Sequence, residues 1–271
     1  MGIITLLTDF GTQDEYVGVL KGVILTINPS VTIVDITHHI APQGIDQAGE
    51  VINAAYSWFP RDTIHLIIVD PEVGSGRHIV ALRSHGHTFV APDNGLLGPI
   101  IADGQVTGAF RVENERLYRQ PVSATFHGRD IFAPVAAHLS LGVPIEQLGP
   151  AVGGDHIVRR PYQHCEFSTN GAIIGKVVYI DRFGNLGTNI DRRSVTQLTG
   201  PSREDAIEIE ICGQIISRLS ENYAQSDPEE LTALFNSRNR LEIAINGGNA
   251  AHSVAARPGT VVQVTKTHDK T

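Results

Sequence analysis

Apolar and polar positions alternate along the first part of the chain in a pattern that predicts strands separated by helices. Three short apolar runs, at residues 3–8, 32–36 and 63–69, are typical of strands buried on both faces. Apolar residues recur at helical spacing from residue 17 to 27, and a second helix is expected at about residues 45–59. Because the order β-α-β-α-β favours parallel strands joined by right-handed crossovers, we expect an α/β domain with a mainly parallel sheet.

The pattern changes further along the chain. Two β runs at residues 79–83 and 88–91 indicate a hairpin, and an apolar run with small side chains at 131–139 predicts a helix. Between residues 142 and 162 the periodicity gives way to glycine and proline, which we interpret as a connector between domains. Beyond it, short runs bounded by turns predict the strands of a compact barrel or sandwich, at residues 172–180, 185–190, 206–211, 241–246 and 260–265.

The expected organisation is therefore an N-terminal α/β domain, residues 1–162, and a smaller C-terminal all-β, barrel-like domain, residues 163–271. The 271 residues carry a formal net charge of −8, which argues against nucleic acid as a partner because phosphate binding needs a basic surface. Cys165 and Cys212 lack the spacing of a zinc ribbon or a disulfide framework. No apolar stretch reaches the roughly 18 residues that a membrane span requires, so we expect a cytoplasmic protein without membrane association.

The segment VDPEVGSGR, residues 69–77, carries the first candidate site. Asp70 directly follows the third apolar run, so it lies at the carboxyl end of a strand, where ligands bind in open α/β sheets. The two glycines allow the backbone to turn back tightly, so that Arg77 can face Asp70. Such a pair is also compatible with a structural salt bridge that closes a turn. Asp9 ends the first strand in the same way and is expected on the same edge of the sheet.

Other polar residues stand at turns and helix starts. His127 precedes the helix expected at 131–139, where its imidazole could hold or relay a proton on a water; a hydrogen-bonded structural histidine is the alternative. His85 and His87 would share a strand face and could chelate a metal, although no third ligand is evident. Asp93 or Asn94 suits the cap of a following helix.

Two clusters in the second domain combine aromatic, amide and acidic side chains. The first is the run from Asp181 to Asn185, which includes Phe183, and the second joins the segment 236–238 with Glu242. An aromatic ring beside amides and acids suits a nucleobase pocket, because the ring stacks while the polar groups pair with the base edge. The same residue types are also ordinary turn chemistry.

Several blocks of sequence, in the same order, resemble the S-adenosyl-L-methionine (SAM) hydroxide adenosyltransferases, also called SAM hydrolases, which are relatives of the fluorinase and chlorinase. Any one block is a weak signal, but together they span nearly the whole chain and are specific. They are TDFG at 8–11, VDPEVGSGR at 69–77, PDNGLL at 92–97, TFHGRDIFAP at 125–134, DRFGNLGTNI at 181–190, and NSR at 236–238 with LEIAINGGNAA at 241–251.

The resemblance implies an N-terminal α/β domain with a parallel sheet, a smaller C-terminal β domain, and a homotrimer with active sites between neighbouring subunits. The implied activity is cleavage of SAM by water at the ribose C5′ atom, which gives adenosine and L-methionine. SAM is then the substrate, and neither a cofactor nor a metal is implied. The family's catalytic Asp, Arg and His match Asp70, Arg77 and His127. Because a sulfonium is a good leaving group, Asp70 and His127 need only orient and deprotonate a water while Arg77 stabilises the developing hydroxide.

The same matching implies the substrate contacts. Asp9 would hold the ribose hydroxyls, and the stretch from Asp14 to Tyr16 would contact the methionine or the ribose. Asp181 would bind the methionine ammonium, with Phe183 and Asn185 facing the adenine or the methionine. Ser237, Arg238 and Glu242 correspond to further contacts, of which Arg238 is the candidate for the methionine carboxylate. Asn239 and Arg240 depart from the glycine and aromatic residue of the relatives, which affects the contacts to the adenine edge.

Three other functions are weighed against the hydrolase. The halogenating relatives replace the triad aspartate with tyrosine, and a carboxylate at position 70 beside a desolvated halide is unfavourable; the fluorinase's extra loop is also absent at residues 83–89. A metal-dependent hydrolase would need a ligand pattern such as HExxH, which the sequence lacks. A non-catalytic SAM- or adenosine-binding protein would keep the pocket without needing the triad. The sequence therefore predicts a SAM hydrolase.

Overall fold

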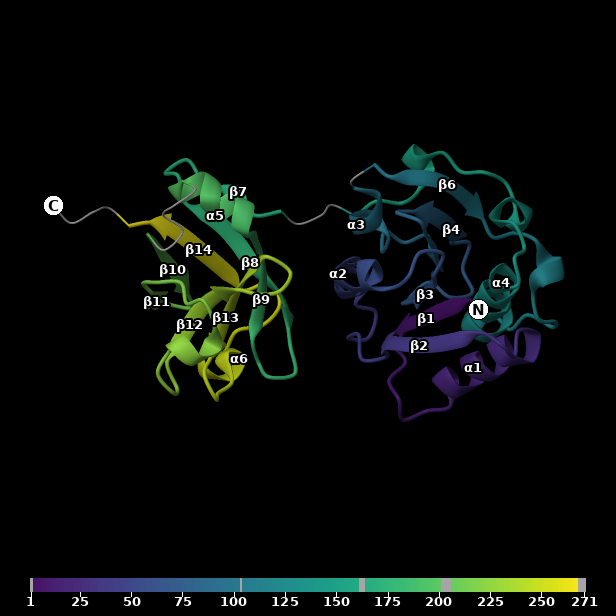
Figure 1. The fold of residues 1–271 in the computed structure, drawn as a ribbon, viewed down its shortest axis with the longest axis horizontal. Helices are drawn as coiled ribbons and strands as arrows, with labels where there is room; N and C mark the ends of the chain where they lie inside the picture. Colours follow the sequence, from purple (N-terminus) through teal and green to yellow (C-terminus); the bar gives the residue numbers. More distant parts are fainter. Residues whose placement is uncertain (1, 103, 161–163, 201–205, 268–271) are drawn as a thin grey trace. The chain divides into compact units, whose positions relative to one another are not determined.

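The chain forms two compact units, Met1–Tyr162 and Gln163–Thr271, each with its own sheet and hydrophobic core (Figure 1). The computed structural model describes residues 2–102, 104–160, 164–200 and 206–267. The α/β class of the first unit and the all-β class of the second, both predicted from the sequence, are confirmed.

The N-terminal unit is built on a six-stranded mixed sheet with the order β2-β1-β3-β5-β4-β6. Its parallel part comprises the neighbouring strands β2, β1, β3 and β5, and the hairpin of β4 and β5 and the last strand, β6, add antiparallel pairs. The strands are β1 (Ile3–Thr8), β2 (Thr32–Thr37), β3 (Ile64–Ile68), β4 (Ile79–Ser84), β5 (His87–Pro92) and β6 (Val106–Arg111). The hairpin is confirmed, whereas β6 was not predicted.

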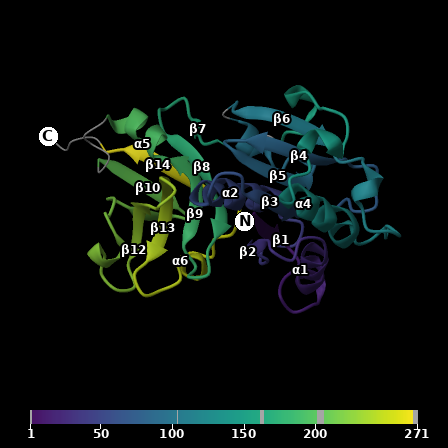
Figure 2. The ribbon, with the colours of Figure 1, turned by 45° about the vertical axis from the view of Figure 1, so that its right-hand side comes forward.

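Helices cover both faces of this sheet (Figures 1 and 2). The helices α1 (Tyr16–Ile27) and α4 (Ala133–Ser140) pack together on one face, and α2 (Ile45–Ala55) and α3 (Gly98–Ile101) pack together on the other. The residues of β3 alternate between the two cores: Leu66 and Ile68 join the first, and Ile67 joins the second. This burial on both faces is the reason that the strand reads as a continuous apolar run.

Two expectations for this unit are wrong. The strand β2 is partly exposed rather than buried on both faces, because it lies at the edge of the sheet. The segment that follows residue 142 is not a free connector but packs on the unit, with Ile145 and Leu148 buried in the core and the Arg111 amide bonded to the carbonyl of Pro150 at 2.9 Å. Sparse apolar residues among glycines and prolines anchor it. The end of the expected connector, residues 161–162, lies outside the described residues.

The order of the strands reverses between β1 and β3, so a ligand site is expected at the carboxyl ends of these two strands. From β1 the chain crosses through α1 to β2 on one side, and then returns through α2, on the opposite face, to β3 on the other side. Thr8 at the end of β1 pairs with Ile68 at the end of β3. Ligands bind at such reversals of strand order, because the two loops diverge there.

The C-terminal unit is a strongly curved antiparallel sheet with the order β11-β10-β14-β8-β9-β13-β12, and β7 pairs with β8. Leu219, which follows β11, pairs with Ala233 of β12, so the first and last strands approach one another and the sheet is barrel-like. All five predicted strands are present, whereas β7, β11 and β12 were not predicted. The strands are β7 (Glu166–Phe167), β8 (Ile173–Ile180), β9 (Leu186–Asp191), β10 (Ile207–Ile211), β11 (Gln214–Ile216), β12 (Leu231–Phe235), β13 (Arg240–Ile245) and β14 (Val261–Lys266).

Short helices complete both units. In the C-terminal unit, α5 (Arg192–Thr199) is capped by the side chain of Asp191, and α6 (Ala250–Ser253) is capped by that of Asn249. Single turns of 3₁₀-helix are η1 (Tyr56–Trp58), η2 (Glu115–Leu117), η4 (Ile145–Leu148), η5 (Gly154–His156) and η6 (Tyr223–Gln225), and one turn of π-helix, η3 (Gly128–Phe132), precedes α4.

Candidate functional site

Asp70 and Arg77 form a buried ion pair at the carboxyl end of β3. The Arg77 Nε atom lies 2.9 Å from each carboxylate oxygen of Asp70, and Nη2 donates a further hydrogen bond to Oδ2. Both side chains are only 5% exposed, and the guanidinium lies 5.4 Å from the centroid of the Phe132 ring. A buried guanidinium with this fork of hydrogen bonds fixes the orientation of the carboxylate.

His127 joins the same cluster from a distant part of the sequence. Its Nδ1 atom lies 3.1 Å from Arg77 Nη2, and because a guanidinium only donates, Nδ1 is the acceptor and a neutral imidazole carries its proton on Nε2. Burial lowers the pKa of His127, the positive charge of Arg77 lowers it further, and the negative charges of Asp70 and Asp130 oppose the shift without cancelling it. The imidazole is therefore neutral at pH 7.

Backbone contacts hold the loop of Asp70 and Arg77 beside the segment that carries His127. Gly74 has a φ of +80°, and a Cβ atom there would lie 2.3 Å from the carbonyl oxygen of Ala124, so the position requires glycine. The buried side chain of Asn94 donates to the carbonyl of Val69 at 2.9 Å and so fixes the end of the strand. The structure thus brings together three side chains that the sequence distributes over more than fifty positions.

Asp93 and Asn94 do not cap the following helix. The residue before α3 is Leu97, and no side chain accepts a hydrogen bond there. Asp93 instead accepts a hydrogen bond from the backbone N–H of Val158 at 2.9 Å. Both side chains thus bond to the backbone of other loops and not to the helix start, Asp93 to Val158 and Asn94 to Val69.

The predicted site residues that follow β1, Asp9, Asp14 and Tyr16, differ in their exposure and in their contacts. Asp9 accepts a hydrogen bond from the backbone N–H of Gln43 at 2.8 Å, and Asp14 is exposed. Tyr16 is 41% exposed, and its ring packs edge-on against Phe126, the neighbour of His127, with the centroids 5.2 Å apart. The aromatic contact links the start of α1 to the loop of His127.

In the C-terminal unit, Asp181 organises a tight turn. Its Oδ1 atom accepts hydrogen bonds from the backbone N–H groups of Phe183, at 2.8 Å, and Asn185, at 2.9 Å, and Oδ2 accepts one from the Asn185 side chain at 3.1 Å. The turn leaves the ring of Phe183 74% exposed. An exposed ring of this kind offers a stacking surface for a planar ligand.

A pocket of about 420 Å³ lies in the C-terminal unit, a volume within the usual range of small-molecule sites. It contains four of the expected site residues, Asp181, Ser237, Arg238 and Glu242, whereas Phe183 and Asn185 do not line it. The other residues that line it are Tyr179, Glu221, Asn222, Tyr223, Leu234, Phe235 and Asn236.

Glu242 is the buried centre of this pocket, with 4% of the residue exposed. It accepts hydrogen bonds from the Tyr223 hydroxyl at 2.6 Å and from the Asn236 amide at 2.9 Å, and that amide also donates to the Tyr179 hydroxyl at 3.0 Å. Burial and the hydrogen bond to Glu242 raise the pKa of Tyr223. The guanidinium of Arg238 lies 5.0 Å from the centroid of the Tyr179 ring. Neither tyrosine was predicted as a site residue, because no motif in the sequence includes them.

The pair of histidines at 85 and 87 does not form a metal site. His85 lies in the turn of the hairpin, with a φ of 55°, and not on the strand. His87 is buried, and its Nδ1 atom lies 3.2 Å from Nε2 of His65. Within the described part of the chain, no group of three His, Cys, Asp or Glu residues could hold a metal ion.

The fold and site define a two-domain protein: an α/β unit carries a buried pair of acid and guanidinium with a partly buried imidazole beside it, and a β unit carries a polar pocket. The family models for the SAM hydroxide adenosyltransferase N-terminal domain and C-terminal domain match residues 4–149 and 175–263. The chain belongs to the SAM hydroxide adenosyltransferase family, which confirms the resemblance seen in the sequence.

Individual relatives come from both branches of the family. The chain is 34% identical to an (R)-S-adenosyl-L-methionine hydrolase of Salinispora tropica, over 97% of each chain, and 33% identical to one of Thermus thermophilus, over 95% of this chain and 97% of that one. It is 28% identical to a fluorinase of an Actinoplanes species, over 97% of each chain. The crystal structure of an uncharacterized conserved protein from Thermotoga maritima matches with a TM-score of 0.90 at 34% identity, covering 97% of this chain and 100% of that one.

None of the helices in the described ranges combines the length and the apolar character needed to cross a bilayer.

Proposed function

We propose that this protein hydrolyses SAM to adenosine and L-methionine by attack of water on the ribose C5′ atom. The reaction balances as SAM⁺ + H₂O → adenosine + L-methionine + H⁺: a C5′–O bond forms, the C5′–S bond breaks, and its electron pair stays on sulfur. The observation that carries the proposal is the cluster of Asp70, Arg77 and His127, in which Arg77 bonds directly to both other side chains. Three relatives that are 32–34% identical to this chain over nearly its full length are named hydrolases, which supports the proposal.

The hydrogen bonds of the cluster favour Asp70 as the proton acceptor. Arg77 presents two N–H groups to the carboxylate, so about half of its roughly four lone-pair sites stay open for a water. The Nδ1 atom of His127 is occupied by Arg77, which leaves Nε2–H to orient the water as a donor. Arg77 fixes both partners and stabilises the negative charge that develops on the oxygen. Alignment of this water with the C5′–S bond is the main contribution of the protein.

We assign the recognition of SAM to the remaining site residues. Arg238, exposed on the pocket of the C-terminal unit, binds the methionine carboxylate, and Asp181 binds the ammonium. Phe183 offers its exposed ring to the adenine, and Asn185, Ser237 and the segment of Asp14 and Tyr16 add contacts. Asp9 binds the ribose hydroxyls. Glu242 acts within the pocket by holding Tyr223 and Asn236 in place.

Halide transfer is the second candidate, because fluorinases are among the relatives. Asp70 forms an ion pair with Arg77, and a carboxylate there repels a desolvated halide. The same carboxylate attracts a water, which can donate a hydrogen bond to it. The charge of the site therefore favours hydrolysis.

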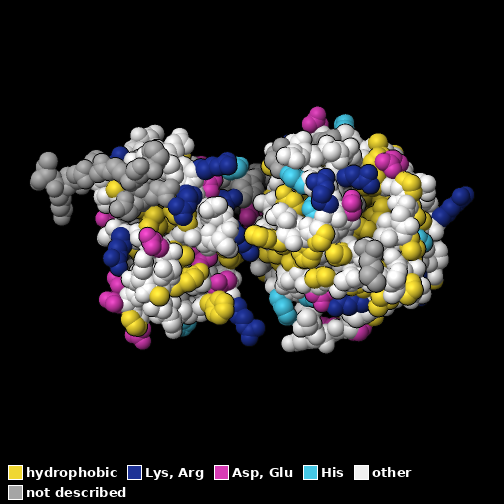
Figure 3. Space-filling model, viewed as in Figure 1, with side chains coloured by type: hydrophobic (Ala, Val, Ile, Leu, Met, Phe, Trp, Pro, Cys, Tyr) yellow, Lys and Arg dark blue, Asp and Glu magenta, His cyan; other side chains and the backbone are white. Residues whose placement is uncertain are grey.

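We also propose a homotrimer and a cytoplasmic location. Hydrophobic side chains form a band across the visible face of the N-terminal unit, a feature typical of surfaces that bind another protein (Figure 3). Trp58 and Leu141 are 84% and 56% exposed. Cys165 and Cys212 are free thiols, which suits a reducing compartment. Light scattering coupled to size-exclusion chromatography would test the trimer by its mass.

The function is tested by incubating the purified protein with SAM and separating the products by chromatography. Adenosine and methionine should form in equal amounts without added halide, and EDTA should not reduce the rate. A 5′-halogenated nucleoside formed on addition of chloride or fluoride would identify a halide transferase instead. Binding of SAM without any product would identify a binding protein.

A further inference from the structure

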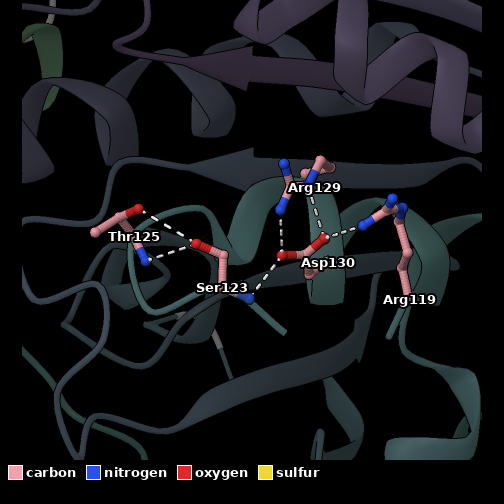
Figure 4. Close-up of polar contacts among 5 residues, drawn as sticks. All are labelled: Arg119, Ser123, Thr125, Arg129 and Asp130. Carbon is pink, nitrogen blue, oxygen red and sulfur yellow. Dashed lines mark hydrogen bonds and ion pairs between the residues drawn. The ribbon is translucent and has the colours of Figure 1, made fainter. Parts of the chain in front are cut away.

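A second buried carboxylate, Asp130, lies three residues after His127 at the start of the helical segment that leads into α4. Its side chain is fully buried, and Figure 4 shows it at the centre of a cluster with Arg119, Ser123 and Arg129. Arg129 donates to both carboxylate oxygens, through Nε at 2.7 Å and Nη2 at 2.8 Å. Ser123 donates its backbone N–H at 2.8 Å, and Arg119 Nη1 lies at 3.3 Å. Each carboxylate oxygen of Asp130 thus accepts two hydrogen bonds.

The backbone of Asp130 holds the same loop. Its carbonyl accepts a hydrogen bond from the N–H of Arg119 at 2.8 Å, and its N–H donates to the carbonyl of Phe126 at 3.2 Å. The guanidinium of Arg129 lies 5.3 Å from the centroid of the Phe126 ring. One residue therefore fastens the loop at positions 119, 123 and 126, directly before His127.

This loop also contacts the segment that carries the other two members of the cluster. The Ala124 carbonyl lies so close to Gly74, between Asp70 and Arg77, that a Cβ atom at this position would clash with it. Ser123 and Thr125 stiffen the turn further, since the Ser123 hydroxyl accepts from the Thr125 N–H at 3.3 Å. A displacement at Ser123 would therefore move His127 relative to Arg77.

We propose that Asp130 is a positioning residue for His127: its bonds to Arg129, Arg119 and Ser123 hold the imidazole at hydrogen-bond distance from Arg77. This inference rests on the proposed hydrolysis, in which His127 orients the water. Within the described residues, Asp130 bonds to neither Asp70 nor Arg77, and its carboxylate is paired with Arg119 and Arg129. It acts on the reaction through the geometry of the loop.

The test is a double-mutant cycle between Asp130→Asn and His127→Ala, measured as kcat and KM for SAM. Asparagine keeps the size of the side chain but loses the bidentate bond to Arg129 and the charge. We expect kcat to fall about 10- to 100-fold, the usual cost of a displacement of about 1 Å at a reacting centre, with KM within about twofold. Asp46→Asn is the control, because Asp46 also pairs with an arginine, Arg160, but on the exposed surface. It should leave kcat and KM unchanged.

The cycle separates positioning from general stabilisation. If Asp130 acts through His127, the double variant should have a kcat closer to that of His127→Ala alone than to the product of the two single losses. A kcat closer to that product, or an Asp130→Asn variant with normal kcat, would overturn the inference. Should Asp130→Asn not fold, the same cycle is read with Arg129→Gln, whose side chain is 31% exposed.

Failure of the proposed hydrolysis and failure of the positioning role of Asp130 give different experimental results. If the wild-type protein releases no adenosine, the proposed function is wrong. If the wild type is active and His127→Ala is impaired but the cycle is multiplicative, the proposed function stands and the role of Asp130 is wrong.

Discussion

The two units prepare their functional groups differently. In the N-terminal unit, Asp70, Arg77 and His127 are bonded directly to one another, and the pair of Asp70 and Arg77 is almost fully buried. In the C-terminal unit, Glu242 and Asn185 are buried, whereas Arg238 and Phe183 reach into solvent. Chemistry requires groups held in one geometry before the substrate arrives, whereas recognition tolerates side chains that adjust on contact.

This difference predicts that substitutions in the first unit reduce turnover and those in the second reduce affinity. A change that removes a group acting only in the transition state lowers kcat, and one that removes a ground-state contact raises KM.

The largest effect should come from Asp70→Ala. Loss of the proposed proton acceptor should lower kcat about 100- to 10,000-fold, the usual worth of general acid–base catalysis, with little change in KM. Steady-state assays of adenosine release would measure both constants, and circular dichroism would verify the fold. A kcat within a few-fold of wild type would show that the cluster is only structural.

Acid should lower the stability of the N-terminal unit and so distinguish it from the C-terminal unit. Burial, with a contribution from the neighbouring His87, lowers the pKa of His65 in the N-terminal core to about 3 from an ordinary 6.5. Between these values the unfolded chain binds a proton that the folded chain does not, so stability falls as the pH falls. The full loss is at most about 5 kcal/mol, since one pKa unit is worth about 1.4 kcal/mol.

His65→Gln should reduce this acid dependence, although the variant loses packing against Phe89 and starts from a lower stability at pH 7. Chemical denaturation at pH 7 and at pH 4 gives the free energy of unfolding of each variant at each pH. His39→Gln, at an exposed position, is the matched control and should retain the wild-type dependence. An unchanged pH dependence in His65→Gln would rule out His65 as its source.

In the C-terminal unit, Arg238→Ala should raise KM for SAM about 10-fold while kcat stays within about twofold, because the arginine is proposed to bind the carboxylate far from the reacting carbon. Arg193→Ala, on the exposed surface of α5 in the same unit, is the control and should change neither constant. A loss confined to kcat in Arg238→Ala would contradict the division of roles.

The smallest effect should be the pH dependence of turnover near neutrality. Because burial and Arg77 lower the pKa of His127, the imidazole stays neutral down to pH values below 6.5, and kcat should be flat above that. Further acidification protonates Nδ1, which breaks its bond with Arg77, so kcat should fall. A profile of kcat from pH 5 to 8 checks this, and His127→Gln should lose the acid limb.

The sequence predicted most of the N-terminal sheet because each strand there is defined by its own residues. The run at Ile64–Ile68 is apolar throughout, since helices cover both of its faces, and Asp70 marks its end. Only seven positions separate Asp70 from Arg77, so turn residues were enough to predict their pairing. The edge strand β2 was misjudged because its apolar residues resemble those of a central strand.

The polar network of the C-terminal pocket could not be predicted in the same way. Glu242 meets Tyr223 and Asn236 across strands and loops, and Tyr179 lies more than fifty positions away from Asn236. Such contacts depend on how the strands curve and pair, which local periodicity does not encode. The proposed role of Asp130 could not be predicted from the sequence for the same reason, because it depends on contacts between its carboxylate and the loop that folds over it.

The most direct test of the central claim is to run the reaction in ¹⁸O-labelled water and analyse both products by mass spectrometry. Attack of water on the ribose carbon predicts one ¹⁸O atom in each adenosine, at the 5′-hydroxyl, and none in methionine. Unlabelled adenosine, or label in methionine, would contradict the account.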